Sequence, residues 1–179
     1  MRLFVGIFLP KEVLDYLYEV QNILKKSLPA KIIWVHKKIL HLSLKFLGEV
    51  NENRINEIKE KLNKIKFKSF KVKLDKVGVF PNENYIRVIW VGLNPKGKVI
   101  ELQQKIDSEL LDLFPKDQRF SAHMTFGRVK FIKDKEEFKK NLKIEINEKE
   151  FKVNEFCLVK STLSKDGPKY EILEKFKLE

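Results

Sequence analysis

Residues 41–44 read HLSL and residues 123–126 read HMTF, so one pattern occurs twice: a histidine, an apolar residue, a hydroxyl residue and a second apolar residue. The chain has 3 histidines among 179 residues, and two of them stand in this frame, 82 positions apart. Coincidence is a poor explanation for such a match. The repetition predicts half of an active site, used twice.

The spacing has a physical meaning if each stretch is a β-strand, because residues i and i+2 of a strand project from the same face. His41 and Ser43 then share one face, and so do His123 and Thr125, while the apolar residues between them enter a core. A single strand histidine is more often structural. The two matching copies are what favour a paired-histidine site over a coincidental strand pattern.

Hydrophobic periodicity and turn residues predict the elements around these strands. Helices are expected over residues 11–27, 55–65, 96–114 and 135–142, and further strands over 2–9, 32–35, 70–79, 85–92, 151–153, 156–163 and 169–176. Helices and strands mix without a regular parallel rhythm, which favours an α+β fold with mostly antiparallel sheet. No linker or low-complexity tract appears, so residues 1–179 are expected to form one domain.

The charge balance is strongly basic. The chain has 37 Lys and Arg against 25 Asp and Glu, a formal net charge of +12, which favours a polyanionic partner such as nucleic acid. Richness in Lys and Glu is also typical of hyperthermophile proteins, and that tendency would explain part of the excess without RNA.

The single cysteine, Cys157, rules out an internal disulfide and argues against a structural zinc site. No apolar run approaches the roughly 20 residues that span a bilayer, and the short apolar start is followed by Pro10 rather than a cleavage site. We therefore expect a cytoplasmic protein without membrane association, and a monomer.

Two imidazoles facing one another can divide the proton transfers of a displacement at phosphorus. One takes a proton from the attacking oxygen and the other gives one to the leaving oxygen, and histidine suits both roles because its pKa is near 6.5. Ser43 and Thr125 would donate hydrogen bonds to the non-bridging phosphate oxygens. No carboxylate cluster, P-loop or metal-ligand spacing appears, so we expect chemistry without metal or nucleotide cofactor.

Residues 41–48 (HLSLKFLG) and 120–128 (FSAHMTFGR) resemble the paired His-x-Thr/Ser-x motifs of the two-histidine (2H) phosphoesterase superfamily. Within it, the chain resembles the RNA 2′,3′-cyclic phosphodiesterases, long called 2′-5′ RNA ligases. The similarity extends over nearly the whole chain, through residues 2–7, 78–81, 87–92, 161–163 and 167–170.

This resemblance implies a bilobal fold in which two pseudo-symmetric, mostly antiparallel sheets, each backed by helices, surround a central basic cleft. It implies an enzyme that opens the 2′,3′-cyclic phosphate at an RNA end, single-stranded or tRNA-derived, to a 2′-phosphomonoester. By family analogy His41 is the proton donor and His123 the proton acceptor; the residues alone leave this assignment open. The family also implies a slow, ATP-independent 2′-5′ joining of RNA ends.

The sequence departs from the family pattern without losing a reacting group. Ser43 replaces the commoner threonine, Ala122 stands where proline is frequent, and residues 126–127 (FG) replace leucine and alanine. His36 is expected to be an exposed loop residue. Trp34, Phe80, Tyr85 and Tyr170 could stack an RNA base, although core packing is the stronger default for each.

Two basic residues near the motifs are candidates for substrate binding. Arg128 matches phosphate geometry, but strict strand alternation places it on the face opposite His123, so it reaches the site only at a strand end or a bulge. Lys45 shares parity with His41 and could contribute to the potential of the cleft, with a solvated surface lysine as the alternative.

Two other functions are compatible with the sequence. One is a non-catalytic module that holds single-stranded RNA with its positive charge, although such a module gains nothing from matched imidazole and hydroxyl groups. The other is a phosphodiesterase that acts on small cyclic nucleotides or related cyclic phosphates rather than on RNA.

Overall fold

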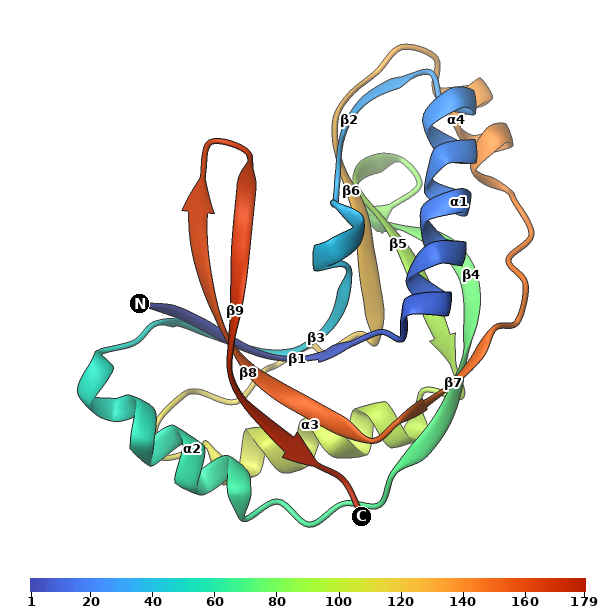
Figure 1. Cartoon of the computed structure of the whole chain (residues 1–179). Helices are drawn as coiled ribbons and strands as arrows, with labels where there is room; N and C mark the ends of the chain where they lie inside the picture. Colours follow the sequence, from blue (N-terminus) through green and yellow to red (C-terminus); the bar gives the residue numbers. More distant parts are fainter.

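A computed structural model describes all residues, 1–179, and has one strongly curled antiparallel sheet backed by helices (Figure 1). The α+β class predicted from the sequence is confirmed. The strands are β1 (Arg2–Phe8), β2 (Ala30–Trp34), β3 (His41–Glu49), β4 (Phe70–Asn82), β5 (Tyr85–Asn94), β6 (His123–Ile132), β7 (Glu150–Val153), β8 (Glu155–Ser164) and β9 (Gly167–Lys177). The α-helices are α1 (Lys11–Ser27), α2 (Ile55–Asn63), α3 (Gly97–Glu109) and α4 (Lys135–Leu142), and short 3₁₀ helices cover Lys37–Ile39 and Glu52–Arg54.

The expectation of two separate sheets is wrong, because all nine strands belong to one sheet. Its order is β7-β4-β5-β6-β3-β1-β8-β9, with β2 on the free stretch of β6. The two halves meet where β3 pairs with β6, and Leu42 opposite Met124 is the register pair that joins them. These are the second residues of the two histidine motifs. The motifs therefore form the seam of the molecule.

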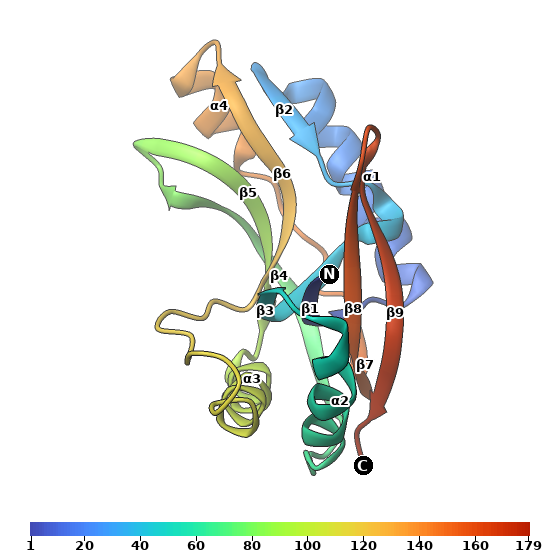
Figure 2. The same ribbon diagram turned by 90° about the vertical axis from the view of Figure 1, so that its left-hand side faces the viewer.

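Helices pack behind each half of the sheet and leave the opposite face open. Helices α1 and α4 lie behind the half formed by β2, β4, β5 and β6, whereas α3 contacts β3 and α2 contacts β9 in the other half (Figures 1 and 2). The buried face of α1 consists mainly of Val13, Leu17, Val20 and Leu24, which are at most 3% exposed. The buried apolar residues of both halves merge into one core.

Helix α3 ends at Glu109, five residues earlier than the periodicity predicted. The following residues form turns that lead to Pro115 and Asp117, whose polar groups bond to a buried lysine and a buried aspartate described below. Tertiary hydrogen bonds therefore end this helix where the apolar spacing alone would continue it. No helix combines the length and the apolar character needed to cross a membrane.

Candidate active site

A β-bulge follows the hydroxyl residue of the first motif. Gly6 of β1 pairs with Ser43 and Val5 pairs with Lys45, so Leu44 is the extra residue. A bulge reverses the alternation of side chains beyond it. As a result, Lys45 turns into the protein and is 1% exposed, while Phe46 turns out and is 67% exposed.

The second motif has the same bulge at the equivalent position. Trp90 of β5 pairs with Thr125 and Ile89 pairs with Gly127, so Phe126 is the extra residue. Arg128 is therefore returned to the face that carries His123 and is exposed. The bulge on which the expected approach of Arg128 to the site depended is present.

The prediction that Lys45 faces the cleft is wrong. Its ammonium group forms a buried ion pair with Asp107 of α3 and also donates to the Pro115 carbonyl oxygen at 2.9 Å. The prediction assumed that side chains alternate regularly along β3, and the bulge at Leu44 interrupts this alternation. Lys45 is neither a substrate contact nor a solvated surface lysine.

His41 is held at both ring nitrogens. Its Nδ1 lies 2.7 Å from the Ile39 carbonyl oxygen, which makes Nδ1 the donor, and its Nε2 lies 2.8 Å from Ser43 Oγ. In the neutral ring the Ser43 hydroxyl donates to Nε2. The serine thus shares the strand face with His41, as predicted, and touches the nitrogen that faces away from the backbone.

His123 is oriented in the same way. Its Nδ1 lies 2.8 Å from the Ser121 carbonyl oxygen, again two residues earlier in the chain. Each imidazole thus has Nδ1 engaged by the backbone and Nε2 directed away from it. A histidine with one nitrogen fixed in this manner has a defined tautomer and presents the other for proton transfer.

The four motif side chains cluster across the seam. In an antiparallel ladder, the Leu42–Met124 register extended by one residue places His41 opposite Thr125 and Ser43 opposite His123, on the face away from the core. All four are partly buried, whereas Leu42 and Met124 are 1% and 0% exposed. Each histidine therefore has a hydroxyl residue from its own motif and one from the other motif as neighbours.

The pKa values of both histidines are lowered from the usual value near 6.5. Burial is the main cause for His41; the hydrogen bond to Ile39 opposes it, and the positive charge of His123 lowers the pKa further. For His123 burial again lowers the pKa, and the hydrogen bond to Ser121 opposes this effect. A positive charge on His123 thus disfavours protonation of His41.

Aromatic rings surround His41 on the open face. The ring centroid of Phe4 lies 4.8 Å from that of His41, and the Tyr170 ring meets His41 edge-on at 5.2 Å. Gly6 allows this close approach, because a Cβ there would lie 3.1 Å from Phe4 and 3.4 Å from His41 ring atoms. This packing explains the desolvation of the His41 imidazole.

A second aromatic pair lies against His123. The Phe80 ring is edge-on to His123 at 4.9 Å between centroids, and Phe80 itself packs 5.1 Å from Trp90. Gly78 is required beneath Trp90, because a Cβ at that position would overlap the indole ring. Phe80 and Tyr170, candidates for base stacking with core packing as the default, thus pack against the two histidine rings, while Trp34 and Tyr85 pack against neither ring.

Two features near the histidines were not predicted from the sequence: the exposed ring of Phe46 on the histidine face, and the effect of two arginine charges on Tyr170. Burial raises the Tyr170 pKa, and the positive charges of Arg128 and Arg2 oppose this effect. Phe46 packs 6.2 Å from Phe4 and occupies the place in the first motif that Arg128 occupies in the second. The 82-residue offset that relates the histidines also relates this pair.

The third histidine has a local structural role. His36 is exposed, and its Nδ1 accepts a hydrogen bond from the Lys38 backbone N–H at 3.3 Å, which caps the first 3₁₀ helix. The expectation that it is an exposed loop residue is confirmed. No group of three or more His, Cys, Asp or Glu side chains that could hold a metal ion is present.

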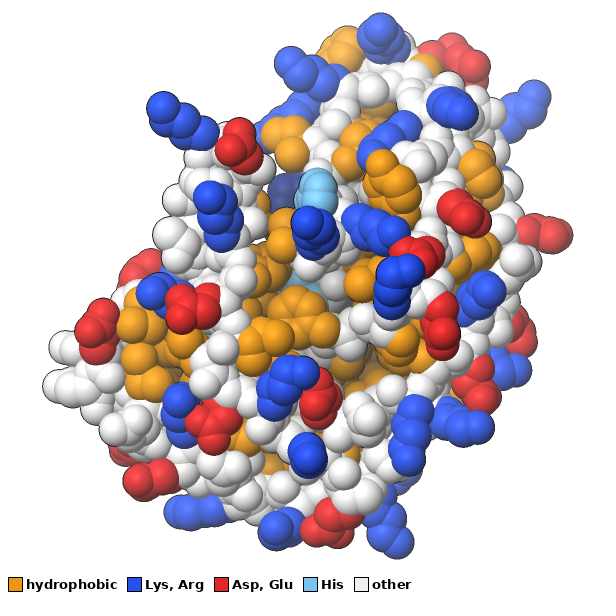
Figure 3. All heavy atoms as spheres, viewed as in Figure 1, with side chains coloured by type: hydrophobic (Ala, Val, Ile, Leu, Met, Phe, Trp, Pro, Cys, Tyr) orange, Lys and Arg blue, Asp and Glu red, His pale blue; other side chains and the backbone are white.

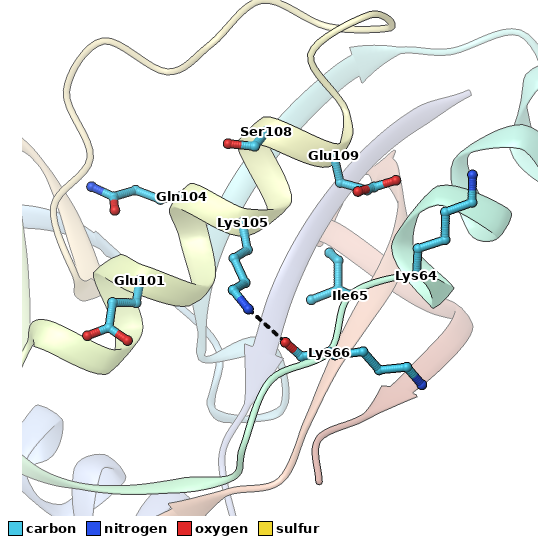
Figure 4. Close-up of a pocket in the computed structure, with 8 residues that line it drawn as sticks. All are labelled: Lys64, Ile65, Lys66, Glu101, Gln104, Lys105, Ser108 and Glu109. Carbon is cyan, nitrogen blue, oxygen red and sulfur yellow. Dashed lines mark hydrogen bonds between the residues drawn. The ribbon is translucent and has the colours of Figure 1, made fainter.

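One pocket of the surface lies away from the histidines. It has a volume of about 490 Å³ and opens between the end of α2 and helix α3, with Lys64, Lys105 and Glu101 in its lining (Figure 4). Lys105 donates to the Lys66 carbonyl oxygen at 2.8 Å and is thereby engaged within the protein. Basic side chains are spread over the whole face shown in Figure 3, with acidic ones interspersed.

Comparison with known proteins agrees with this geometry. The sequence profile described as "LigT like Phosphoesterase" matches residues 7–90 and, a second time, residues 91–170. The chain therefore belongs to the LigT-like phosphoesterase family, the two-histidine phosphoesterases that its motifs resemble. The double match also shows an internal duplication, with one histidine motif in each copy.

Relatives and solved structures match over nearly the full length. An RNA 2′,3′-cyclic phosphodiesterase of Methanocaldococcus jannaschii is 37% identical over 98% of this chain and 100% of its own length. One of Thermotoga maritima is 34% identical over 97% of this chain and 93% of its own. Among crystal structures, TT0787 of Thermus thermophilus has a TM-score of 0.80 at 28% identity, covering 99% of this chain and 97% of its own. E. coli LigT with 3′-AMP has the same fold, with a TM-score of 0.77 at 24% identity and coverages of 99% and 97%.

Proposed function

We propose that this protein hydrolyses the 2′,3′-cyclic phosphate at the end of an RNA and yields a 2′-phosphomonoester. The observation that carries the proposal is the matched fixation of His41 and His123. Each ring is tied through Nδ1 to a carbonyl two residues upstream, and each presents Nε2 beside the seam between β3 and β6. The full-length similarity to RNA 2′,3′-cyclic phosphodiesterases supports the choice of substrate.

The two imidazoles divide the proton transfers. Neutral His123 Nε2 takes a proton from a water molecule, whose oxygen attacks phosphorus as the bond from phosphorus to the 3′ oxygen breaks on the opposite side. Protonated His41 Nε2 donates its proton to the departing 3′ oxygen, so the phosphate stays on the 2′ oxygen and the ribose ends with a 3′ hydroxyl. The assignment of donor and acceptor follows the family analogy, and each transfer contributes about 10²- to 10⁴-fold to the rate.

Hydroxyl and guanidinium groups stabilise the charge that develops on the phosphate. Ser43 and Thr125 donate to the non-bridging oxygens, and in the free enzyme the Ser43 hydroxyl is held by His41 until substrate arrives. Arg128 stands on the same face of β6 and approaches those oxygens as a planar, permanently charged donor. Phe46 offers an exposed ring on which the terminal base stacks.

The RNA remains in contact with the protein beyond its terminal phosphate, as the net charge of +12 favours. We expect single-stranded or tRNA-derived ends to be the preferred substrates over small cyclic nucleotides. Ligation is the reverse reaction, in which a 5′ hydroxyl replaces water and forms a 2′-5′ bond without ATP. It requires no group beyond those named.

The test uses a labelled RNA oligonucleotide that ends in a 2′,3′-cyclic phosphate, incubated with the wild type, His41→Ala and His123→Ala in the presence of EDTA. Chromatography against 2′- and 3′-phosphate standards gives the position of the product phosphate. A 2′-phosphate from the wild type, with both variants slower by at least about 10²-fold, supports the proposal. Tight RNA binding without turnover would instead favour the binding-module alternative.

A parallel assay separates the substrate classes. Turnover of the oligonucleotide should exceed that of a mononucleoside 2′,3′-cyclic phosphate, and the difference should shrink as salt rises, because salt weakens phosphate contacts. Equal turnover of both at every salt concentration would leave the reaction in place and overturn RNA as the preferred substrate. Adding an oligonucleotide with a 5′ hydroxyl to the same mixture tests for the 2′-5′ joined product.

A further inference from the structure

Lys45, Asp107 and their neighbours form a buried polar cluster next to the first histidine motif. Lys45 and Asp107 are each 1% exposed and form an ion pair. Asp107 also accepts from the Asp117 backbone N–H at 3.0 Å and from Gln103 Nε2 at 3.1 Å. Lys45 in turn reaches the Pro115 carbonyl oxygen at 2.9 Å and the Asp117 carboxylate at 3.5 Å.

This cluster connects the first motif to the segment that leads into the second. Lys45 lies in β3, two residues beyond Ser43. Pro115 and Asp117 begin the irregular segment that ends at His123, and this segment includes the Ser121 carbonyl oxygen that orients the His123 ring. The segment that carries the Ser121 carbonyl oxygen is therefore bonded to the strand of His41.

The other half of the molecule has the reciprocal connection. Gln21 of α1 donates to the Val35 carbonyl oxygen at 2.8 Å and to the Phe126 carbonyl oxygen at 3.0 Å, and the Val35 N–H also donates to Phe126. Phe126 is the bulge residue of the second motif, and Val35 lies six residues before His41. The segment leading to His41 is thus tied to the strand of His123.

The two connections occupy equivalent places in the duplicated sequence. Gln103 stands 82 positions after Gln21, and Asp117 stands 82 positions after Val35, the same offset that separates the histidines. Both glutamines are nearly inaccessible to solvent, at 1% and 3% exposure. One half completes the connection with a neutral amide alone, whereas the other adds Lys45 and Asp107.

Stability is a poor reason for that buried ion pair. Removing two charges from water is costly, and a well-packed apolar pair often serves folding equally well. An ion pair with several fixed hydrogen bonds does specify geometry. If the segment shifted, the buried charges would lose the hydrogen bonds that offset their removal from water. Geometry matters at this place, since a misplacement of about 1 Å at reacting groups can cost about 10²-fold in rate.

We propose that Lys45 is a positioning residue, which acts through Asp107 and Asp117 to hold His123 at its working distance and orientation relative to His41. This role rests on the proposed two-histidine hydrolysis. It belongs to the reaction even though Lys45 touches no substrate. Gln21 provides the matching restraint on His41.

The test compares Lys45→Met, the double variant Lys45→Met/Asp107→Leu, and Lys61→Met as a control. Lys61 also pairs with an aspartate, Asp112, at 2.8 Å, but this pair includes no residue of the segment 115–123. Lys45→Met leaves the buried Asp107 carboxylate without its positively charged partner and should lower both Tm and kcat. The double variant removes both charges, so Tm should recover while kcat stays about 10- to 100-fold low, with KM within about threefold of wild type.

A second readout follows the histidines themselves. In the double variant, NMR titration of ring Cε1 protons should show the pKa of His123 closer to 6.5, because a released segment admits water and burial is what lowers that pKa. Recovery of both Tm and kcat in the double variant would overturn the inference and leave a stability role only. If the double variant does not fold, Asp117→Ala decides: its carboxylate is 36% exposed, and wild-type kcat in this variant would likewise overturn the inference.

The proposed function fails in a different way. An inactive wild type, or active His41→Ala and His123→Ala variants, would refute the two-histidine reaction whatever the Lys45 variants do. A full effect of the histidine substitutions combined with normal kcat in the double variant would refute only the positioning role. Lys61→Met should keep wild-type kcat in either case.

Discussion

Leu42 and Met124 face one another across the seam between β3 and β6, and this register pair joins the two halves of the sheet. Both side chains are buried in the core, at 1% and 0% exposure, directly behind the histidine face. The second residue of each motif therefore joins the two halves of the sheet, and this places the histidine and hydroxyl residues of the motifs together. In each four-residue motif, the second residue forms the seam and the histidine and hydroxyl residues form the active face.

Energetic coupling across this seam is the first prediction. Leu42→Ala and Met124→Ala should each lower the free energy of unfolding by about 2–5 kcal/mol, because each leaves a cavity in a closed core. The double variant should deviate from additivity by about 0.5–3 kcal/mol, since the residues are paired. Urea denaturation of the four proteins measures the coupling, and additive losses would contradict a packed seam.

Arg128 should matter through its geometry as well as its charge. Arg128→Lys keeps the charge and loses the planar fork, so kcat/KM should fall by about tenfold, whereas Arg128→Gln should cost about 10²-fold. Arg87, an exposed arginine paired with Tyr85, gives the matched control, and its substitution by Gln should leave kcat/KM unchanged. Equal values for Arg128→Gln and wild type would remove Arg128 from the site.

The pH dependence should be displaced toward acid. Because the pKa values of both free-enzyme histidines are lowered below 6.5, the bell-shaped profile of kcat/KM should have its maximum below pH 6.5. Bound phosphate favours the imidazolium form, so the profile of kcat should lie at higher pH than that of kcat/KM. A flat profile from about pH 5 to 9, with chemistry rate-limiting, would exclude acid–base catalysis by two histidines.

Tyr170 gives a separate test of the surroundings of His41. Burial is the main cause of the lowered His41 pKa, and the Tyr170 ring forms one wall of that environment. Tyr170→Ala should therefore raise the His41 pKa toward 6.5 in an NMR titration, whereas Tyr170→Phe should leave it in place. An unchanged His41 pKa in Tyr170→Ala would show that other groups exclude the water.

The regular parts of the fold were accessible from the sequence because their apolar residues follow one period. The buried face of α1 and the alternation of His41, Leu42 and Ser43 in β3 are local patterns, and the structure confirms them. The union of both halves into one sheet was not accessible. It depends on the single pairing of Leu42 with Met124, between residues 82 positions apart.

The site was predicted as far as strand alternation holds. His41, Ser43, His123 and Thr125 lie before the bulges and share one face, as expected. Lys45 and Arg128 lie beyond the bulges at Leu44 and Phe126, and their predicted faces were both reversed. A bulge leaves no clear local sequence mark, although a buried lysine needs a partner, and Asp107 on the apolar face of a predicted helix was a signal for one.

The central claim is that His41 and His123 act together in one reaction, and a double-mutant cycle on the chemical step tests it most directly. Single-turnover rates would be measured for the wild type, His41→Ala, His123→Ala and the double variant on an RNA ending in a 2′,3′-cyclic phosphate. Each single variant should lose about 10²- to 10⁴-fold, and the double variant should be hardly slower than the slower single one, because groups that act as a unit are not additive. Losses that multiply, or a single variant within about tenfold of the wild type, would contradict a shared two-histidine mechanism.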